Sequence, residues 1–473
     1  MKKRLFLLFA IVVISFSAYS YLTNPFHTIT IIQNPFTTFV QGDQIEIRRN
    51  FRLQIRKDIL STTFAQLKCA FHIVSNVYFG SQKSKSSKVD EIIAEIHQLR
   101  FDPAKPYLIS GDHFSVLYPR NLGVFYLATL DQTTALDRKD WLNRQQSYLL
   151  ATAYGLEAFT QAGRISTTIV PVAPQSVSLL NIYAYPSDSL YGLLYALKTL
   201  QTPNEATSSY HLQTVSAAKT LERWYAPKLT ELINNYVQTV YDPQTQLVKT
   251  SIHLSGAKDI TKRTSAFYDN VILWKTLSLA KELGFNYQSQ IDLSAYKQKI
   301  LSTYWYPRGG YFLEDLSPAS MSDHYYSSDW LAAFFTGFLD PKNPNELPYF
   351  EKSVAYLHQQ QIDRPFGLKY QQQDRATRQF PLVRIFVPSY GGSSIWSFWG
   401  AEYIKLLHIL SQGTGKTAYE EEAQYQIAQY DKNIVKYRGY PELYDEKGEM
   451  LSGLFYKSIR MTGWVVDFES ARK

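Results

Sequence analysis

A long series of helix-period segments dominates this chain from residue 106 onward. Apolar residues recur there at the spacing of an α-helix, and no run with the pattern of parallel strands interrupts them. The predicted helices cover residues 121–131, 141–162, 187–201, 213–240, 265–283, 292–304, 324–338, 347–361, 393–412, 416–435 and 464–470. With one or two more helices between residues 57 and 99, they form roughly six antiparallel pairs. We therefore predict a mainly α fold, an (α/α)6 toroid in which helical hairpins close into a ring over residues 106–473.

Residues 23–105 are predicted to form a smaller region before the ring. Between residues 27 and 55, apolar residues alternate near period two, and Gln41-Gly42-Asp43 separates two such sets as a turn. A few short strands or an extended stalk both fit this pattern. One helix follows through Tyr78, and a second covers Asp90–Leu99. The region is thus a linker or small cap with short β segments and two helices.

The first 22 residues have the charged start and the apolar run of an export signal, in that order. Met1-Lys2-Lys3-Arg4 precedes an apolar run from Leu5 to about Leu22. Ala18-Tyr19-Ser20 fits a cleavage site, but the run is nearly long enough to cross a bilayer uncut. Either a signal peptide or an N-terminal membrane anchor therefore places the body outside the cytoplasm. The chain has a single cysteine, Cys69, and export without disulfides favours a bacterial cell envelope.

The composition limits the classes of molecule that the protein is expected to bind. Aromatic residues make up 15% of the chain, which excludes a disordered protein and suits the recognition of sugars or peptides. The net charge is +8, but Lys and Arg form no basic stripe, so nucleic acid is not an expected partner. His324 lies near Asp323 and Asp329, yet one His with two acids at a helix start is better explained by capping than by a metal site. Neither a metal nor a cofactor is expected.

The loop before the first ring helix carries charged and aromatic groups beside a Pro/Gly break. It reads Gly111-Asp112-His113-Phe114-Ser115-Val116-Leu117-Tyr118-Pro119-Arg120-Asn121 and leads into an apolar helix. This segment resembles the first substrate loop of glucoamylase-type enzymes, members of the six-hairpin glycosidases, whose pattern ends in Trp-Pro-Arg-Asp. Two further segments are similar to that superfamily. One spans Thr264–Lys275 and opens a helix, and the other is Gly439-Tyr440-Pro441-Glu442-Leu443-Tyr444-Asp445, where those families often place a Pro-Glu base.

The sequence departs from the family pattern in three places. Tyr118 replaces Trp, and Asn121 replaces the Asp that grips sugar hydroxyls. The family's acid lies in a Trp-Glu-Glu-like segment after the third hairpin, but residues 249–259 contain no Glu. The nearest carboxylates are Asp259 and Asp269. Either the acid has changed identity, or the chain has lost catalysis.

The resemblance implies an exported glycoside hydrolase that acts with inversion on an oligo- or polysaccharide. Such hydrolysis needs one acid to protonate the leaving oxygen and a second carboxylate to activate water. We expect Glu442 to be the base and Asp259 or Asp269 to be the acid. Charged groups would hold sugar hydroxyls, and aromatic rings would stack on sugar faces. The expected substrate-binding residues are Asp112, Tyr118, Arg120, Asn121, Trp305, Tyr306 and Tyr390.

Structural roles compete with these assignments. Arg120 could instead form an ion pair across the ring, and Asp112 could stabilise a turn or cap a helix. Asp269 could be a structural carboxylate in a first helical turn. Asp259 and Glu442 could lie in surface loops. Trp396 and Trp399 share one helical face and are expected in the core. Two other functions stay open: a non-catalytic glycan-binding toroid, indicated by a mouth with one carboxylate and an aromatic floor, and a polysaccharide lyase, indicated by a Tyr-His-Arg cluster.

Overall fold

The structure is a computed structural model. It describes residues 27–30, 35–52, 54–56, 71, 75–101, 110–111, 116–123, 138–173, 176–181, 185–202, 213–258, 261–288, 291–372, 387, 389–453 and 456–473. The predicted signal or anchor at residues 1–22 lies outside them. Among the helices that are described, none combines the length and the apolar character needed to cross a membrane.

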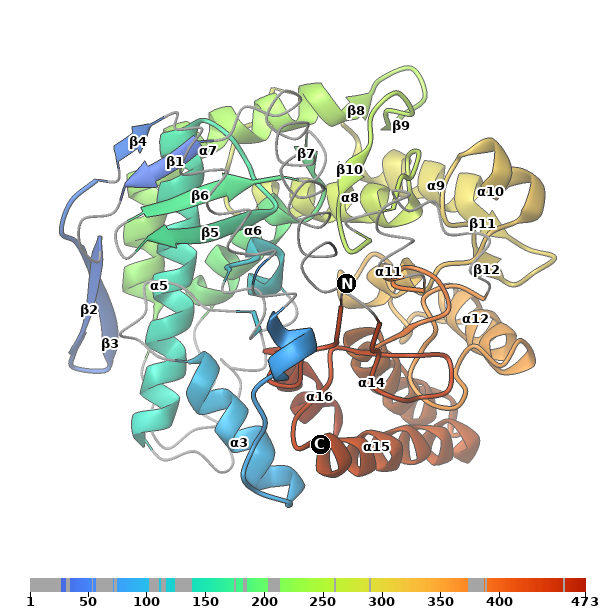
Figure 1. The fold of residues 1–473 in the computed structure, drawn as a ribbon. Coiled ribbons are helices and arrows are strands. Elements are labelled where there is room, and N and C mark those ends of the chain that lie inside the picture. Colours follow the sequence, from blue (N-terminus) through green and yellow to red (C-terminus); the bar gives the residue numbers. More distant parts are fainter. Residues whose placement is uncertain are drawn as a thin grey trace, which may run out of the picture.

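Helices contain most of the residues of the described elements, and they fall into two series that alternate along the chain (Figure 1). The inner series consists of η1 (Pro119–Leu122), α6 (Ser189–Gln201), α8 (Phe267–Glu282), η2 (Ser328–Leu331) with α11 (Ala332–Phe335), α14 (Ser397–Thr414) and α16 (Val465–Ala471). The outer series consists of α3 (Val89–Arg100), α5 (Arg138–Ala162), α7 (Val215–Val240), α9 (Leu293–Tyr304), α12 (Leu347–Gln359) and α15 (Thr417–Tyr437). Helices α6, α8 and α14 are buried on most sides, as expected for helices that are apolar nearly all round, whereas α7, α9, α12 and α15 keep a polar exposed face.

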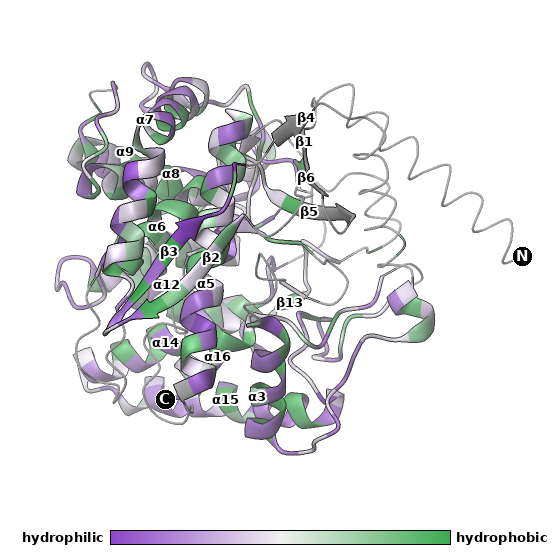
Figure 2. Cartoon of the chain, turned by 90° about the vertical axis from the view of Figure 1, so that its left-hand side faces the viewer, coloured by the Kyte–Doolittle hydropathy of each residue, from purple (hydrophilic) through white to green (hydrophobic). Residues whose placement is uncertain are grey.

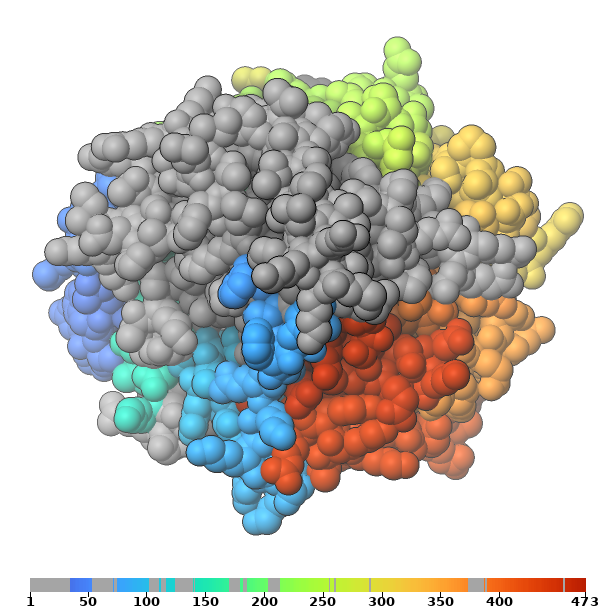
Figure 3. All heavy atoms as spheres, in the orientation of Figure 1, coloured from blue at the N-terminus to red at the C-terminus, as the bar shows by residue number. Residues whose placement is uncertain are grey.

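Inner elements pack on one another in chain order. Contacts run from η1 to α6, α6 to α8, α8 to η2 and α11, η2 to α14, and α14 to α16. On the outside, α3 contacts both α15 and α16, and Figure 3 shows the segment around α3 directly beside the C-terminal segment. His97 Nε2 lies 2.8 Å from Glu469 Oε2 at this junction. Helices from opposite ends of the chain are therefore joined.

The N-terminal strands are part of the helical body. Strands β1 (His27–Thr30), β4 (Gln54–Arg56), β5 (Thr168–Ala173) and β6 (Ser176–Leu180) form an antiparallel sheet in the order β4-β1-β6-β5. The hairpin β5–β6 lies between α5 and α6 in the chain and was not predicted. Of the two alternatives for residues 27–55, the short strands are thus confirmed.

A second hairpin covers two outer helices. Strands β2 (Phe36–Gln41) and β3 (Gln44–Arg49) pair around Gly42 and Asp43, which confirms the predicted turn; Gly42 has a φ of 62°, a region that suits glycine. Ile45 and Ile47 are buried, and the hairpin packs on α5 and α7. In Figure 2, β3 is coloured mostly hydrophilic, whereas β2 also carries the exposed hydrophobic residues Phe39 and Val40. The hairpin explains why α5 has little exposed surface for an outer helix.

Two-residue strands pair the loops that precede or follow the ring helices. The parallel pair is β7 (Tyr185–Pro186) with β10 (Leu254–Ser255). The antiparallel pairs are β8 (Tyr241–Asp242) with β9 (Leu247–Val248), β11 (Trp305–Tyr306) with β12 (Tyr311–Phe312), and β13 (Ile395–Trp396) with β14 (Leu443–Tyr444). A short helix, α10 (Pro318–Asp323), was not predicted.

The helix predictions are confirmed to within about one turn at each end for ten of the eleven ring segments and for residues 90–99. The first, residues 121–131, is described only as far as Gly123, where η1 ends. The predicted helix from residue 57 is likewise described only in part, with residues 75–79 helical.

Candidate functional site

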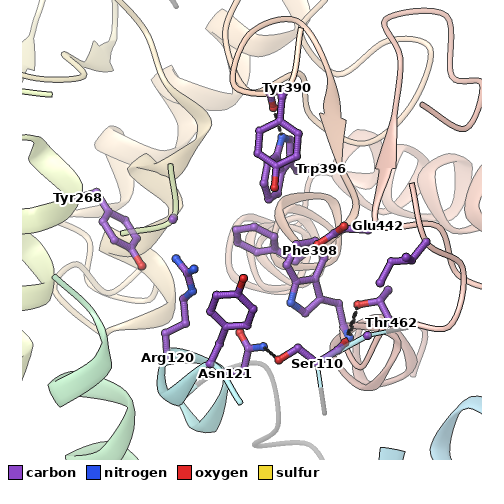
Figure 4. A pocket seen from close by; sticks show the side chains of 14 residues that line it. Ser110, Arg120, Asn121, Tyr268, Tyr390, Trp396, Phe398, Glu442 and Thr462 are labelled. Atoms are coloured by element: carbon purple, nitrogen blue, oxygen red, sulfur yellow. Dashed lines mark hydrogen bonds between the residues drawn. The ribbon is translucent and has the colours of Figure 1, made fainter. Parts of the chain in front are cut away.

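A cavity that is open to solvent at its mouth lies where several inner elements begin; the space between its walls, open solvent included, is about 600 Å³ (Figure 4). The starts of η1, α8, α14 and α16 all contribute lining residues. The polar lining residues are Ser110, Tyr118, Arg120, Asn121, Tyr268, Glu442 and Thr462. The apolar ones include Tyr390, Trp396, Phe398, Ile459 and Trp464. Five of the ten residues predicted for the site thus share one cavity: Tyr118, Arg120, Asn121, Tyr390 and Glu442.

Arg120 and Asn121 are held by close packing of η1 on α6. Pro119 opens η1, and a Cβ at Gly192 of α6 would lie 2.1 Å from the Pro119 carbonyl oxygen, so only glycine allows this approach. The Arg120 guanidinium donates to the Gly256 carbonyl and lies 4.8 Å from the centre of the Tyr118 ring. Asn121 donates from its amide to Ser110 Oγ at 2.9 Å, so the residue that replaces the family's Asp helps to fix the cavity wall.

Asp188 lies behind this wall and was missed in the sequence. Its Oδ2 accepts a hydrogen bond from the Tyr268 hydroxyl at 3.0 Å and lies 3.5 Å from Arg120 Nη1. The side chain is fully buried. An acid at the start of a predicted helix, residues 187–201, is the available sequence signal, but an acid at a helix start ordinarily indicates a cap.

Glu442 projects into the cavity from the side opposite Arg120 and Tyr268 (Figure 4). Its backbone is tied to the start of α14, because the N–H and the hydroxyl of Ser397 both donate to the Glu442 carbonyl, at 3.1 and 3.0 Å. The Tyr456 hydroxyl donates to Glu442 Oε2 at 3.0 Å. Burial and the nearby Glu442 carboxylate raise the pKa of Tyr456 well above its usual value, so the phenol keeps its proton. The surface-loop alternative for Glu442 is therefore wrong.

Aromatic rings form the rest of the wall. Trp396 lies 4.9 Å from Tyr390 and 5.8 Å from Trp464, measured between ring centres. The Trp396 indole N–H donates to the Tyr390 carbonyl at 2.8 Å, which fixes the loop before α14. The prediction that Trp399 belongs to the core is confirmed, but Trp396 lines the cavity instead of lying wholly in the core.

The other predicted site residues lie elsewhere. Trp305 packs on Phe312 and Tyr349, and Tyr306 stacks on His324 with 4.2 Å between ring centres; neither is among the described lining residues. Their placement corrects the expectation that they stack on substrate in this cavity, because the tight β11–β12 pair directs them to its own aromatic cluster. Asp112 and Asp259 lie outside the described residues.

Asp269 is buried in the first turn of α8 and does not line the cavity. Its Oδ1 lies 3.8 Å from Arg263 Nη2, and Arg263 also pairs with Asp329. Burial raises the pKa of Asp269 to about 7, although Arg263 acts in the opposite direction. The structural alternative thus describes the position of Asp269 better than the role of an acid in contact with substrate.

A buried ion pair anchors the loop that precedes α8. Lys258 Nζ lies 2.5 Å from Glu314 Oε1, with both side chains almost fully inaccessible, and 4.4 Å from the centre of the Tyr370 ring. Gln371 donates to the second oxygen of Glu314 at 2.7 Å. Ala257, the residue before Lys258, lines the cavity, so the Lys258–Glu314 pair fixes this part of the cavity wall. Asp259 is the next residue in the chain.

The free energy of unfolding should fall as the pH rises from 5 to 8, and replacing Asp269 by Asn should make this fall smaller. The folded pKa of about 7 exceeds the ordinary value of 3.8, so the folded protein binds the extra proton. The contribution of this group is present at low pH and is lost as the pH rises through 7. The loss amounts to about 2–3 kcal/mol between pH 5 and pH 8, and Asn, which cannot ionise, should abolish it. Chemical unfolding at both pH values measures this, and an unchanged pH dependence would contradict it.

The acids near His324 do not form a metal site with it. His324 ends α10 and stacks on Tyr306, whereas Asp329 pairs with Arg263. A different group, His358, Asp363 and Glu422, brings its ligand atoms within 4.8 Å of one another. Arg364 already supplies a cation there, since its guanidinium donates to both oxygens of Glu422 at 2.7 and 2.8 Å.

No family model and no curated protein sequence matches this chain. Solved structures do match. A GH63 mannosylglycerate hydrolase from Thermus thermophilus in complex with glucose is 12% identical, with 81% of this chain and 99% of that chain covered and a TM-score of 0.48. The Hormoconis resinae glucoamylase is 11% identical, with 81% and 73% covered and a TM-score of 0.48. A D-mannose isomerase is 10% identical, with 81% and 97% covered and a TM-score of 0.47. A glucoamylase is thus among the matches, in line with the sequence resemblance, but likeness at this level assigns no activity to the chain.

Proposed function

We propose that this protein is a glycoside hydrolase built on an (α/α)6 toroid and that the cavity at the starts of the inner helices is its active site. One observation carries the proposal: Glu442, buried and held by Tyr456, faces Arg120 and Tyr268 across a cavity whose wall also carries aromatic rings, those of Tyr390, Trp396, Phe398 and Trp464 among them. A carboxylate, a fork of N–H donors and aromatic faces in one small cavity are the groups that bind and hydrolyse a sugar.

The cavity offers complementary surfaces to a sugar ring. The hydroxyl and amide groups of Ser110, Asn121 and Thr462, with the Arg120 guanidinium, suit hydroxyl groups. Trp396, Phe398 and Trp464 suit the C–H faces of a pyranose. None of the described lining residues is a histidine, so the Tyr-His-Arg cluster of a lyase finds no support there.

Glu442 is proposed as the base that activates water. The Tyr456 hydroxyl stabilises its ionised form and limits its rotation. The acid is proposed to be Asp259, one of the two candidates from the sequence, because it follows Ala257, which lines the cavity, by two positions in the chain. The family resemblance implies inversion, in which the two carboxyl groups stand far enough apart to admit a water molecule.

Glycan binding without hydrolysis is the second candidate. It is favoured by one specific observation: Glu442 is the only carboxylate among the described residues that line the cavity. If no acid joins it in the complete site, the same groups would hold a sugar and leave its glycosidic bond intact.

We also propose export to the bacterial cell envelope, with the N-terminal segment either cleaved or retained as an anchor. The charged start and the apolar run from Leu5 to about Leu22 support this. A carbohydrate partner outside the cytoplasm, such as a wall or capsular oligosaccharide, fits both proposals. Fractionation of cells that express the protein, followed by N-terminal sequencing, tests them.

The function is tested with the full-length protein on aryl glycosides of both anomers and on neutral and acidic oligosaccharides. We expect hydrolysis of a subset, and proton NMR of the first product should show inversion at the anomeric carbon. Retention would reject the proposed pairing of Glu442 with a distant acid. Binding without hydrolysis would select the second candidate, and neither binding nor hydrolysis would overturn both.

A further inference from the structure

We propose that Asp188 is a positioning residue that fixes Arg120 and Tyr268 as one wall of the cavity. The inference rests on the proposed function for what this wall binds. Asp188 itself does not line the cavity, whereas Arg120 and Tyr268 both do. Its action on a ligand would therefore pass through these two side chains.

Asp188 occupies a helix-cap position without capping the helix. It is the residue before α6, where an Asp ordinarily accepts hydrogen bonds from the first backbone N–H groups. No such side-chain bond is made. The carboxylate is directed instead to the Tyr268 hydroxyl at 3.0 Å and to Arg120 Nη1 at 3.5 Å. The chain thus gives up an ordinary cap in favour of contacts with two cavity residues.

The local backbone is built to bring the three side chains together. Strand β7, just before Asp188, pairs with β10, just before Gly256. A Cβ at Gly256 would lie 2.3 Å from Ser187 Oγ and 3.2 Å from the Tyr268 ring, so glycine allows this approach without a shift of either side chain. The Gly256 carbonyl then accepts from Arg120. Carboxylate, guanidinium and phenol are therefore fixed by one compact junction of α6, β10 and α8.

The charge of Asp188 explains how both groups stay oriented. A buried carboxylate stabilises the guanidinium of Arg120 and accepts the hydrogen bond that the Tyr268 hydroxyl donates. Burial, and next the Asp188 charge, raise the pKa of Tyr268 well above its usual value, so its hydroxyl remains a donor. Arg120 has five N–H groups, so its guanidinium can donate to the Gly256 carbonyl and pair with Asp188 while it lines the cavity. Figure 4 shows the Tyr268 hydroxyl and the Arg120 guanidinium directed toward each other at the cavity.

The test uses Asp188→Asn in the full-length protein, which keeps the shape and removes the charge. Binding of the iminosugar 1-deoxynojirimycin, a hexopyranose mimic, is measured by calorimetry. We expect the affinity to fall about tenfold to hundredfold. Asp363→Asn is the matched control, because Asp363 is also fully buried and ion-paired, but its partners His358 and Arg364 are not among the described residues that line the cavity. The control should lower stability and leave the affinity unchanged.

A double-variant cycle separates positioning from a general structural role. If Asp188 acts through Tyr268, the affinity lost in the double variant Tyr268→Phe/Asp188→Asn should be smaller than the product of the two single-variant losses. Wild-type affinity in Asp188→Asn, or losses that multiply, would overturn the inference.

Failure of the proposed function has a different signature. If the wild-type protein binds neither the iminosugar nor any sugar of the panel and hydrolyses none, the proposed function fails on its own. The role of Asp188 is then decided by crystal structures. Displacement of the Arg120 guanidinium or the Tyr268 ring in Asp188→Asn, with both unmoved in Asp363→Asn, supports positioning. Both groups unmoved in Asp188→Asn overturns it.

Discussion

Glu442→Gln should reduce hydrolysis by at least about a thousandfold while the protein stays folded and still binds sugar. The amide keeps the size of the side chain and can still accept the hydrogen bond from Tyr456. It cannot take a proton from water, so the loss falls on the chemical step. Single-turnover release of product from the best substrate of the panel measures the rate, and calorimetry measures binding.

The matched control for this experiment is Glu446→Gln. Glu446 follows Glu442 closely in the chain, is exposed and lies outside the cavity lining. Its substitution should leave both rate and affinity unchanged. Wild-type hydrolysis in Glu442→Gln would remove this residue from the mechanism, even if the cavity still bound sugar.

Lys258→Met is expected to lower the free energy of unfolding by about 3–5 kcal/mol, the largest stability effect predicted for this chain. The substitution removes the ammonium group next to Glu314 and leaves this carboxylate buried with its negative charge, while the hydrogen bond from Gln371 remains. Burial lowers the pKa of Lys258, whereas Glu314 raises it; losing either partner therefore leaves the other in an environment that disfavours its charge. Chemical unfolding at neutral pH measures the change.

Removing both charges should recover most of this loss. In Lys258→Met/Glu314→Gln no ionised group of the pair is left buried, and the amide introduced at position 314 can still accept from Gln371. Lys297→Met provides the comparison, since the pair of Lys297 with Glu346 at 2.7 Å is partly exposed and should contribute no more than about 1 kcal/mol. A Lys258→Met variant no less stable than Lys297→Met would show that the buried pair is not an anchor of this loop.

The helices were largely predictable because their signal is local. In α7 and α15 the apolar residues recur with helical period on one face, and in α8 a nearly continuous apolar run is bounded by turn residues. The β2–β3 hairpin was predictable for a similar reason, since alternation and Gly42 both belong to one short segment. Strand β1 could be expected as a strand, but its partner β6 lies far along the chain, and no local pattern specifies that pairing.

The candidate site was predictable where a residue lies in a distinctive segment. Arg120 follows a proline at a helix start, and Glu442 follows Pro441 in a loop, and both reach the cavity. Asp188 could not be separated from an ordinary helix cap, because its role depends on Tyr268 and Arg120 from two other elements. Trp305 and Tyr306 have the composition of a sugar platform, but their orientation depends on the β11–β12 pairing, which the sequence does not reveal.

The junction of α3 with the C-terminal helices has a consequence for how the protein folds. His97 and Glu469 meet although they lie 372 positions apart in the chain, so the contact requires one of the longest loop closures available to it. During synthesis, α3 emerges long before α16, and Thr462 and Trp464 complete the cavity only when that last helix docks. A nascent chain can therefore fold its early hairpins one by one, while the cavity is completed last, when residues from both ends of the chain come together.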